Sequence, residues 1–225
     1  MGYTYKRLEQ GQIRIARLTS GGKGVVVEVS VETLDTKIEH YDALSWQWGK
    51  SDPAGSAFVG IRDGRDGELF RMKVPPNLLC ALVRIRDLPD DGFQSLRLWA
   101  DFICINQNDD DERSTQVAMM TQIYEQARTV HIWLGEPGVS MNAGEPDGFN
   151  DKELVQAVQG IKLLGDLDDA NHLGSVDMGM RHKAGLFDLE PVFKLLKRGW
   201  FGRRWTIQAS SLIPRKESLI VDRGC

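Results

Sequence analysis

Cysteine is scarce in this 225-residue sequence, and the positions of its three cysteines exclude two common ways of stabilising a protein. Cys80, Cys104 and Cys225 are far apart and form no Cys-x-x-Cys pair. This spacing argues against a disulfide framework and against a structural zinc site. The four histidines are equally scattered, so we expect no metal site and no bound cofactor. Free thiols suit a reducing compartment, and we predict a cytoplasmic protein.

The sequence also lacks a surplus of positive charge and any long apolar run. Lysine and arginine number 28 against 32 acidic residues, which gives a formal net charge of -4. Binding to nucleic acid needs clustered excess cations, and the basic run at 198–204 is short and interrupted by aromatic residues and glycines. No apolar stretch approaches the length of a membrane span, and no signal peptide is visible. We therefore predict no nucleic-acid partner and no membrane span.

The composition that remains is that of an ordinary globular protein, with 41% hydrophobic and 27% charged residues. We predict one domain over residues 1–225. Its first part favours a β-hairpin, because Ile13–Leu18 alternates apolar and polar residues and Val25–Val31 is rich in β-branched residues. The glycine-rich stretch at 19–24 between them suits the turn.

The rest of the chain alternates between strand-like and helix-like segments. The predicted order is a strand at 38–46, a glycine-rich loop at 49–67, a helix at 77–87, a strand at 96–100, a polar turn at 105–111, a helix at 112–127, a strand at 129–134, a helix at 151–167, short helices after 191 and at 203–212, and a strand at 218–221. Strands that are joined by crossover helices pair in parallel. We predict an α/β fold, with a mostly parallel central sheet flanked by helices and the N-terminal hairpin added. Ligands of such sheets bind at the carboxyl ends of the strands, here after Trp46 and after Ala100.

The first motif, YDALSWQWG at Tyr41–Gly49, places two tryptophans at a strand exit. Trp46 and Trp48 are two residues apart and so point to the same face of an extended chain. They could form an aromatic wall for a planar ligand, or they could simply cap the core.

The second motif, LWADFICINQ at Leu98–Gln107, places Asp101 directly after a buried strand, followed by Asn106. A carboxylate beside amide side chains suits the binding of sugar hydroxyls. Alternatively, Asp101 and Asn106 bond backbone amides in the turn and cap the next helix.

Two further stretches carry charge beside apolar residues. At 109–113 acidic residues complement the positive end of the following helix, and Arg113 either pairs with them or reaches back toward Asp101. The apolar stripe of that helix is expected to pack in the core and consists of Val117, Met120, Ile123, Tyr124 and Ala127. In RGWFGRRWTIQ at Arg198–Gln208, the aromatic residues are expected to pack, while the arginines could instead bind a phosphate.

Taken in order, these motifs resemble the heterokaryon-incompatibility (HET) domain of filamentous fungi. The resemblance covers residues 41–209 and includes Met120–Ala127, Trp133–Gly135 and Trp200–Gln208. Each motif alone is weak, but the ordered set is specific. The sequence departs from the family at one position, because Ala209 stands where the family has a glutamate. That alanine is either a natural loss or a substitution that silences a toxic domain.

The resemblance implies non-self recognition that leads to programmed cell death. HET domains look distantly similar to the Toll/interleukin-1 receptor (TIR) fold, which has a flavodoxin-like parallel sheet, and several TIR domains cleave NAD⁺. Position 209 would then carry the catalytic glutamate of an active relative, and this chain would be an inactive form. The alternative is a signalling module that kills by assembly, without enzymatic activity. A conventional nucleotide-binding enzyme is disfavoured, because the sequence contains neither a Walker A motif nor Gly-x-Gly-x-x-Gly after a strand.

The resemblance implies a site, partners and a larger protein. Position 209 and Asp101 are the candidate catalytic positions. The candidate substrate-binding residues are Ser45, Trp46, Trp48, Gly49, Cys104, Asn106, Gln107, Arg113, Arg204, Trp205 and Gln208. The expected partners are NAD⁺ or a related nucleotide, and either further copies of the chain or an upstream receptor. We expect a C-terminal region of a longer protein to be missing from this sequence.

Overall fold

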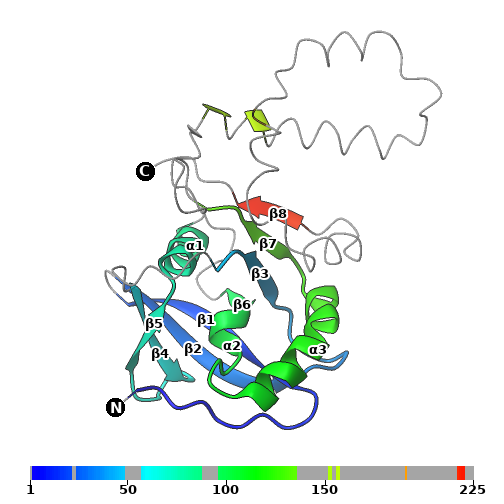
Figure 1. Ribbon diagram of the computed structural model, residues 1–225. Helices are drawn as coiled ribbons and strands as arrows, with labels where there is room; N and C mark the ends of the chain where they lie inside the picture. The colour runs from blue at the N-terminus through cyan, green and yellow to red at the C-terminus, as the bar shows by residue number, and fades with distance from the viewer. Residues whose placement is uncertain are drawn as a thin grey trace, which may run out of the picture. The chain divides into compact units, whose positions relative to one another are not determined.

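The computed structural model describes residues 2–21, 24–48, 57–87, 96–135, 152–153, 156–157, 191 and 217–220 (Figure 1). The chain divides into two compact units. One consists of Met1–Gly135 with Arg204–Ile220, and the other of Glu136–Arg203 with Val221–Cys225. The architecture below is that of the first unit, because few residues of the second are described. A single domain over residues 1–225 stays a prediction.

In the described part of the chain, eight strands form one mixed sheet in the order β5-β4-β2-β1-β6-β3-β7-β8. The strands are β1 (Gln12–Gly21), β2 (Gly24–Thr33), β3 (Asp42–Trp46), β4 (Ala57–Asp63), β5 (Phe70–Val74), β6 (Arg97–Ala100), β7 (Val130–Trp133) and β8 (Glu217–Ile220). The described helices are α1 (Pro76–Arg86), α2 (Asp101–Cys104) and α3 (Asp110–Gln126). The first strand of the chain therefore lies in the interior of the sheet (Figure 1).

The predicted N-terminal hairpin is confirmed. Strands β1 and β2 pair antiparallel along their full length, from Gln12↔Thr33 to Gly21↔Gly24. On its other side β1 pairs antiparallel with β6. Four consecutive residues of β1, from Ile13 to Ala16, are buried, so both faces of this strand are covered. The hairpin is thus part of the core.

The C-terminal half of the sheet is parallel, as the alternation of strands and helices predicts. Strand β3 pairs in parallel with β6 and with β7, and β7 pairs in parallel with β8. Every residue of β3 and of β7 is buried, as is typical of strands that are covered on both faces. The carboxyl ends of β3, β6 and β7 consequently meet at one edge of the sheet.

The prediction of a mostly parallel sheet is corrected to a mixed sheet. Strand β1 is antiparallel to both of its neighbours, and β4 is antiparallel to β5. The physical reason is that β1 and β2, and likewise β4 and β5, are consecutive strands joined by turns rather than by crossover helices, and a turn reverses the chain. Strand β2 pairs in parallel with β4.

The predicted loop at 49–67 is wrong for its second part, which forms β4. Glycines in this stretch suggested a loop, yet Gly60 lies within the strand. A side chain there would come within 3.1 Å of Leu69 and of Val26, so the glycine allows close packing. The turn after β4 uses Gly64, whose φ is 58°. Strand β5 was not predicted at all.

Helices α1 and α3 follow the predicted ranges closely. The short α2 lies between the predicted strand at 96–100 and the predicted turn at 105–111, where no helix was predicted. Pro76 begins α1, as the sequence predicts. The side chain of Asp109 caps α3 by accepting the backbone N–H of Glu112. Helix α2 packs on β1 and β6, directly after the strand that ends at Ala100 (Figure 1).

The buried face of α3 agrees with the predicted apolar stripe only in part. Ile123 and Ala127 of that stripe are buried, but Val117 is 37% exposed, and Gln116, which is not part of the stripe, is buried. The reason is that β1 offers polar partners to this helix: the amide of Gln116 donates to the carbonyl of Gln12, and the carboxylate of Glu112 binds Arg14. Polar interactions, and not only apolar contact, therefore fix how the helix lies on the sheet.

Several predicted elements lie outside the described residues. For the helix at 151–167, residues 152–153 and 156–157 are helical. The predicted helices after 191 and at 203–212 lie outside the described residues, apart from Pro191, which is helical. The predicted strand at 218–221 is confirmed as β8. Among the described residues, no helix combines the length and the apolar character that crossing a membrane requires.

Candidate functional site

The carboxylate of Asp101 binds the indoles of the first motif. Its Oδ1 accepts the Nε1–H of Trp46 at 2.8 Å, and its Oδ2 accepts the Nε1–H of Trp48 at 2.9 Å. Oδ1 also accepts the backbone N–H of Phe102 at 2.7 Å. The ends of β3 and β6 therefore meet at one carboxylate, as the two strand-exit motifs predict. We call Trp46, Trp48, Asp101 and Phe102 the carboxylate–indole cluster.

The three rings of this cluster pack closely around the carboxylate. The indoles of Trp46 and Trp48 are stacked, with centroids 5.9 Å apart and an interplanar angle of 15°. The ring of Phe102 lies edge-on to Trp48 at 5.2 Å. Trp46 is 1% exposed and Trp48 is 37% exposed. Trp46 is therefore part of the core, whereas the ring of Trp48 is partly exposed; an aromatic wall for a planar ligand stays a prediction.

A third indole at the same edge of the sheet is fixed by an amide. Trp133, at the end of β7, donates its Nε1–H to Oδ1 of Asn77 at 2.7 Å. Asn77 lies in the first turn of α1 and donates its amide to the carbonyl of Gln47 at 2.6 Å. The ends of β3 and β7 are therefore joined through one side chain of α1, which limits how far the chain after Trp46 can move.

Cys104, a predicted substrate contact, lies in the core. It is 0% exposed, and burial raises the pKa of its thiol to about 12. Its sulfur receives the backbone N–H of Ala100 and faces the carbonyl of Leu98. Cys104 therefore holds the end of α2 against the core, and its neutral thiol is not accessible to solvent.

The other predicted site residues that the structure describes lie in β3, after α2 and at the start of α3. Ser45, in β3, is 8% exposed. Asn106 accepts the backbone N–H of Asn108, and Gln107 donates to the carbonyl of Asp101 at 2.9 Å. Arg113 pairs with Asp110 at 2.9 Å. The structure therefore shows the first of the two predicted alternatives, pairing with the acidic residues at the start of α3.

The remaining predicted residues lie outside the described residues. They are Gly49, Arg204, Trp205, Gln208 and Ala209. Their place beside the carboxylate–indole cluster, and with it a single cleft lined by all three motifs, stays a prediction.

A second buried carboxylate lies at the other end of β3. Asp42 is 1% exposed, and its Oδ2 is 2.8 Å from Nε2 of His131. Arg128 donates to both of its oxygens, at 2.9 and 3.1 Å. Burial alone would raise the pKa of Asp42, but the bonds from His131 and Arg128 outweigh burial and hold that pKa below its usual range. This site binds its own cation and ties the amino ends of β3 and β7 together.

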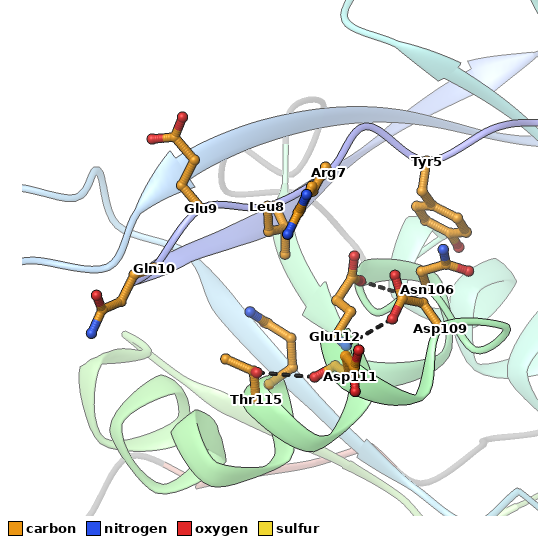
Figure 2. Close-up of a pocket in the computed structure, with 11 residues that line it drawn as sticks. Tyr5, Arg7, Leu8, Glu9, Gln10, Asn106, Asp109, Asp111, Glu112 and Thr115 are labelled. Carbon is orange, nitrogen blue, oxygen red and sulfur yellow. Dashed lines mark hydrogen bonds between the residues drawn. The ribbon is translucent and has the colours of Figure 1, made fainter.

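A groove of about 750 Å³ separates the N-terminal segment from the start of α3 (Figure 2). Tyr5 and Arg7 line it on one side, and Asn106, Asp109 and Glu112 on the other. Sequence reasoning did not find it, because the segment at 2–9 has no periodicity that would place it beside a helix. Across the described residues, no group of three or more His, Cys, Asp or Glu side chains is placed to hold a metal ion.

The fold and the cluster define a class: a mixed α/β domain whose parallel strands end at a carboxylate held between two indoles. Residues 41–209 match the family model described as Heterokaryon incompatibility protein (HET). Because the match covers well over half of the chain, this chain belongs to the heterokaryon incompatibility family.

A curated relative agrees with this assignment. The chain is 32% identical over 188 residues to heterokaryon incompatibility protein 6, OR allele, of Neurospora crassa. The alignment covers 75% of this chain and 27% of that protein, so the chain spans about a quarter of the relative's length. No solved structure matches the chain.

Proposed function

We propose that this chain is a cell-death effector domain of fungal non-self recognition that binds NAD⁺ or a related nucleotide. Relatives with glutamate at position 209 would cleave NAD⁺, and the chain with Ala209 would be inactive. The observation that carries the proposal is the carboxylate–indole cluster, which places Asp101 and the half-exposed ring of Trp48 where two parallel strands end.

The order of the parallel strands supports a nucleotide at this edge. Numbered by their order along the chain, β6, β3, β7 and β8 give 2-1-3-4, which is the beginning of the flavodoxin-like order. Folds with that order bind nucleotides at the carboxyl edge, between the first and third strands. Here those strands are β3 and β7, and they end at Trp46 and Trp133. A TIR-like fold is accordingly part of the proposal.

The reaction that we propose for the active form is hydrolysis of an N-glycosidic bond. The bond between C1′ of the ribose and the pyridinium nitrogen breaks, and nicotinamide leaves with the electron pair, which neutralises its positive charge. Water adds to C1′ and loses a proton, so the products are nicotinamide, ADP-ribose and H⁺. The ribose develops positive charge on the way, and a nearby carboxylate stabilises that charge.

The geometry gives Asp101 a supporting role in this chemistry. The carboxylate of Asp101 accepts the N–H groups of Trp46, Trp48 and Phe102, and the Trp48 ring beside its Oδ2 is partly exposed. We therefore expect Asp101 to orient a ribose hydroxyl and to hold the aromatic surface, while the glutamate at position 209 of an active relative performs the catalytic step.

The decisive experiment compares the parent chain with Ala209→Glu and with the uncharged control Ala209→Gln. Nicotinamide release is measured on purified protein, both as expressed and fused to an oligomer-forming partner. We expect release from the Glu variant alone, with a rate about 10²–10³-fold above the Gln variant, which is the usual effect of one preorganised electrostatic group. If the oligomerised Glu variant folds and releases no nicotinamide, the enzymatic proposal is wrong.

The alternative is a cell-death module that acts only by assembly with copies of itself or with an upstream receptor. The same fusion separates the two functions. Toxicity of an oligomerised parent chain, without loss of NAD⁺ from the cells, would favour assembly. Toxicity that requires glutamate at position 209 and tracks the loss of NAD⁺ would favour the enzyme. Action in the cytoplasm, where NAD⁺ is available, belongs to the same proposal.

A further inference from the structure

Helix α2, which carries Asp101, is too short to hold its own position. It has four residues, and its end is closed by one backbone bond, from the N–H of Ile105 to the carbonyl of Asp101. A single helical turn fixes several backbone dihedrals for one hydrogen bond and is unstable alone. The position of the Asp101 carboxylate must therefore depend on groups outside the helix.

Those groups come from three segments and donate to carbonyls of α2. The guanidinium of Arg14, in β1, donates through Nη1 to the carbonyl of Cys104 at 3.0 Å, and the hydroxyl of Tyr5, in the N-terminal segment, donates to the carbonyl of Ile103 at 2.9 Å. Gln107, which follows α2, donates to the carbonyl of Asp101. The last carbonyls of a helix lack partners within the helix, so these donors replace the turn that α2 does not have.

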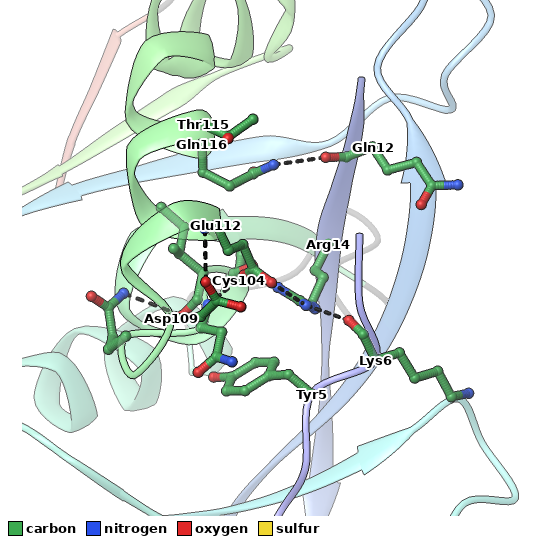
Figure 3. Close-up of polar contacts among 12 residues, drawn as sticks. Tyr5, Lys6, Gln12, Arg14, Cys104, Asp109, Glu112, Thr115 and Gln116 are labelled. Carbon is green, nitrogen blue, oxygen red and sulfur yellow. Dashed lines mark hydrogen bonds and ion pairs between the residues drawn. The ribbon is translucent and has the colours of Figure 1, made fainter. Parts of the chain in front are cut away.

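Arg14 is itself held rigidly. It is 1% exposed, and both terminal nitrogens bind the carboxylate of Glu112, with Nη2 at 2.9 Å from Oε2 (Figure 3). The other bond of Nη2 goes to the carbonyl of Lys6, and the guanidinium lies over the ring of Tyr5 at 4.6 Å. A planar guanidinium can serve four acceptors at once in fixed directions, which a lysine ammonium cannot do.

The same ion pair fixes the chain that follows α2. Oε1 of Glu112 accepts the backbone N–H of Asn106 at 2.7 Å, in addition to its bond with Arg14. One buried pair therefore holds α2 at its last residue and also the turn after it. Arg14 and Tyr5 precede residue 41, where the family match begins.

We infer that Arg14, with Tyr5, is a positioning residue for the carboxylate–indole cluster: it sets the place of Asp101 through α2. The inference rests on the proposed function for what the cluster binds, but the position of Asp101 can be measured without any ligand. A purely structural role would stabilise the fold and leave the two indole bonds unchanged once the protein has folded.

The indole N–H signals of Trp46 and Trp48 report these bonds directly. Two-dimensional ¹H–¹⁵N spectra of the full chain would be recorded for the parent, Arg14→Met, Arg14→Lys and Tyr5→Phe, with peaks assigned from Trp46→Phe and Trp48→Phe. Asp101→Ala supplies the spectrum in which both bonds are lost. The matched control is Arg62→Met, which breaks another partly buried pair, with Glu28, at a distant strand.

We expect Arg14→Met to move both indole signals toward their positions in Asp101→Ala, and to speed exchange of the buried Trp46 N–H about tenfold, which corresponds to about 1.4 kcal/mol. Arg14→Lys keeps the charge but loses the geometry, so it should move the signals in the same direction by less. Tyr5→Phe removes one donor and should give the smallest shift. The control should leave both signals in place.

Unchanged indole signals in a folded Arg14→Met variant would overturn the inference. If that variant does not fold, Tyr5→Phe decides, because it retains the ring and loses only the contacts of the hydroxyl, with the carbonyl of Ile103 and the sulfur of Met72. Shifts that Arg62→Met reproduces would also overturn it, since they would report general loosening. A parent chain that binds no NAD⁺ would contradict the proposed function but would leave these shifts, and the positioning role, intact.

Discussion

The two ends of β3 each hold a buried or partly buried carboxylate, and the two are bound in different ways. At the amino end, Asp42 is covered and receives bonds from Arg128 and His131. At the carboxyl end, the donors to Asp101 that the structure describes are neutral N–H groups of Trp46, Trp48 and Phe102. A cation of the protein compensates the charge of Asp42, and the described N–H groups orient the carboxylate of Asp101.

Under the proposed function, Asp42 is a structural carboxylate and Asp101 is a binding one. Arg128 donates to both oxygens of Asp42 in a bidentate pair, which compensates its charge. We propose that the ligand binds at Asp101, beside the partly exposed ring of Trp48. Substitutions at the two ends should consequently affect different properties, stability at one and binding at the other.

The largest expected loss of stability is that of Asp42→Asn. The change leaves His131 buried without its carboxylate partner and breaks the bidentate pair with Arg128. Arg128 is 56% exposed and can be solvated, so we expect a loss of about 3 kcal/mol, at the lower end for a broken buried pair. Urea unfolding at neutral pH measures it. A loss below that of Asp101→Asn would contradict the comparison.

The same substitution should change how stability depends on pH. The pKa of Asp42 is lowered in the folded chain, so its contribution is complete above the ordinary value of 3.8 and is lost as the pH falls through the folded value. The difference in unfolding free energy between the parent and Asp42→Asn should therefore shrink below about pH 4. Urea midpoints from pH 7 to pH 3 would show this. A constant difference would exclude the ionised pair as the cause.

A smaller loss of stability is expected for Asp101→Asn, with a larger effect on binding. Asparagine can still accept from Trp46 through its oxygen, but its amide group meets the N–H of Trp48, which then turns to solvent. We expect a cost of about 1 kcal/mol, the usual net value of one hydrogen bond. Binding of NAD⁺, measured by calorimetry, should weaken far more than in Asp42→Asn. Equal weakening in both variants would remove the distinction between the two ends.

The smallest change in stability is expected for Trp48, which is 37% exposed. Trp48→Phe keeps an aromatic ring, and Trp48→Ala removes it. If the ring stacks on a base or on nicotinamide, the Ala variant should lose about 1–3 kcal/mol of binding, and the Phe variant less. Calorimetric titration with NAD⁺ compares them. Equal affinity in the Ala variant and the parent would mean that Trp48 covers the core only.

Much of this architecture can be predicted from local sequence, and the failures have a common physical cause. The hairpin, α1, α3 and the parallel strands follow from alternation, helical periodicity and capping residues such as Asp109. The meeting of Trp48 with Asp101 follows from the rule that parallel strands end at one edge. Strand β4 was missed because Gly60 reads as a loop residue, although here it permits close packing.

The partners of Arg14 could not be predicted from one sequence. A charged residue between Ile13 and Ile15 in a buried strand signals that a partner exists, since a lone buried cation is costly. Its partner Glu112 is 98 residues away, and nothing local identifies it. For the same reason the prediction put Val117 on the buried face of α3. Helical periodicity detects apolar residues, but it does not detect polar residues of the helix that are buried because β1 supplies their hydrogen-bond partners.

The interior place of β1 has a practical consequence for any fragment cut at the limits of the family match. A fragment that begins at residue 41 lacks β1 and β2, which lie between β4 and β6 in the sheet. The edge of β6 would then expose backbone N–H and C=O groups that β1 covers in the full chain, and such edges pair readily with other chains. Expressed alone, that fragment should aggregate or self-associate, and an oligomer observed with it would say nothing about how the full chain assembles.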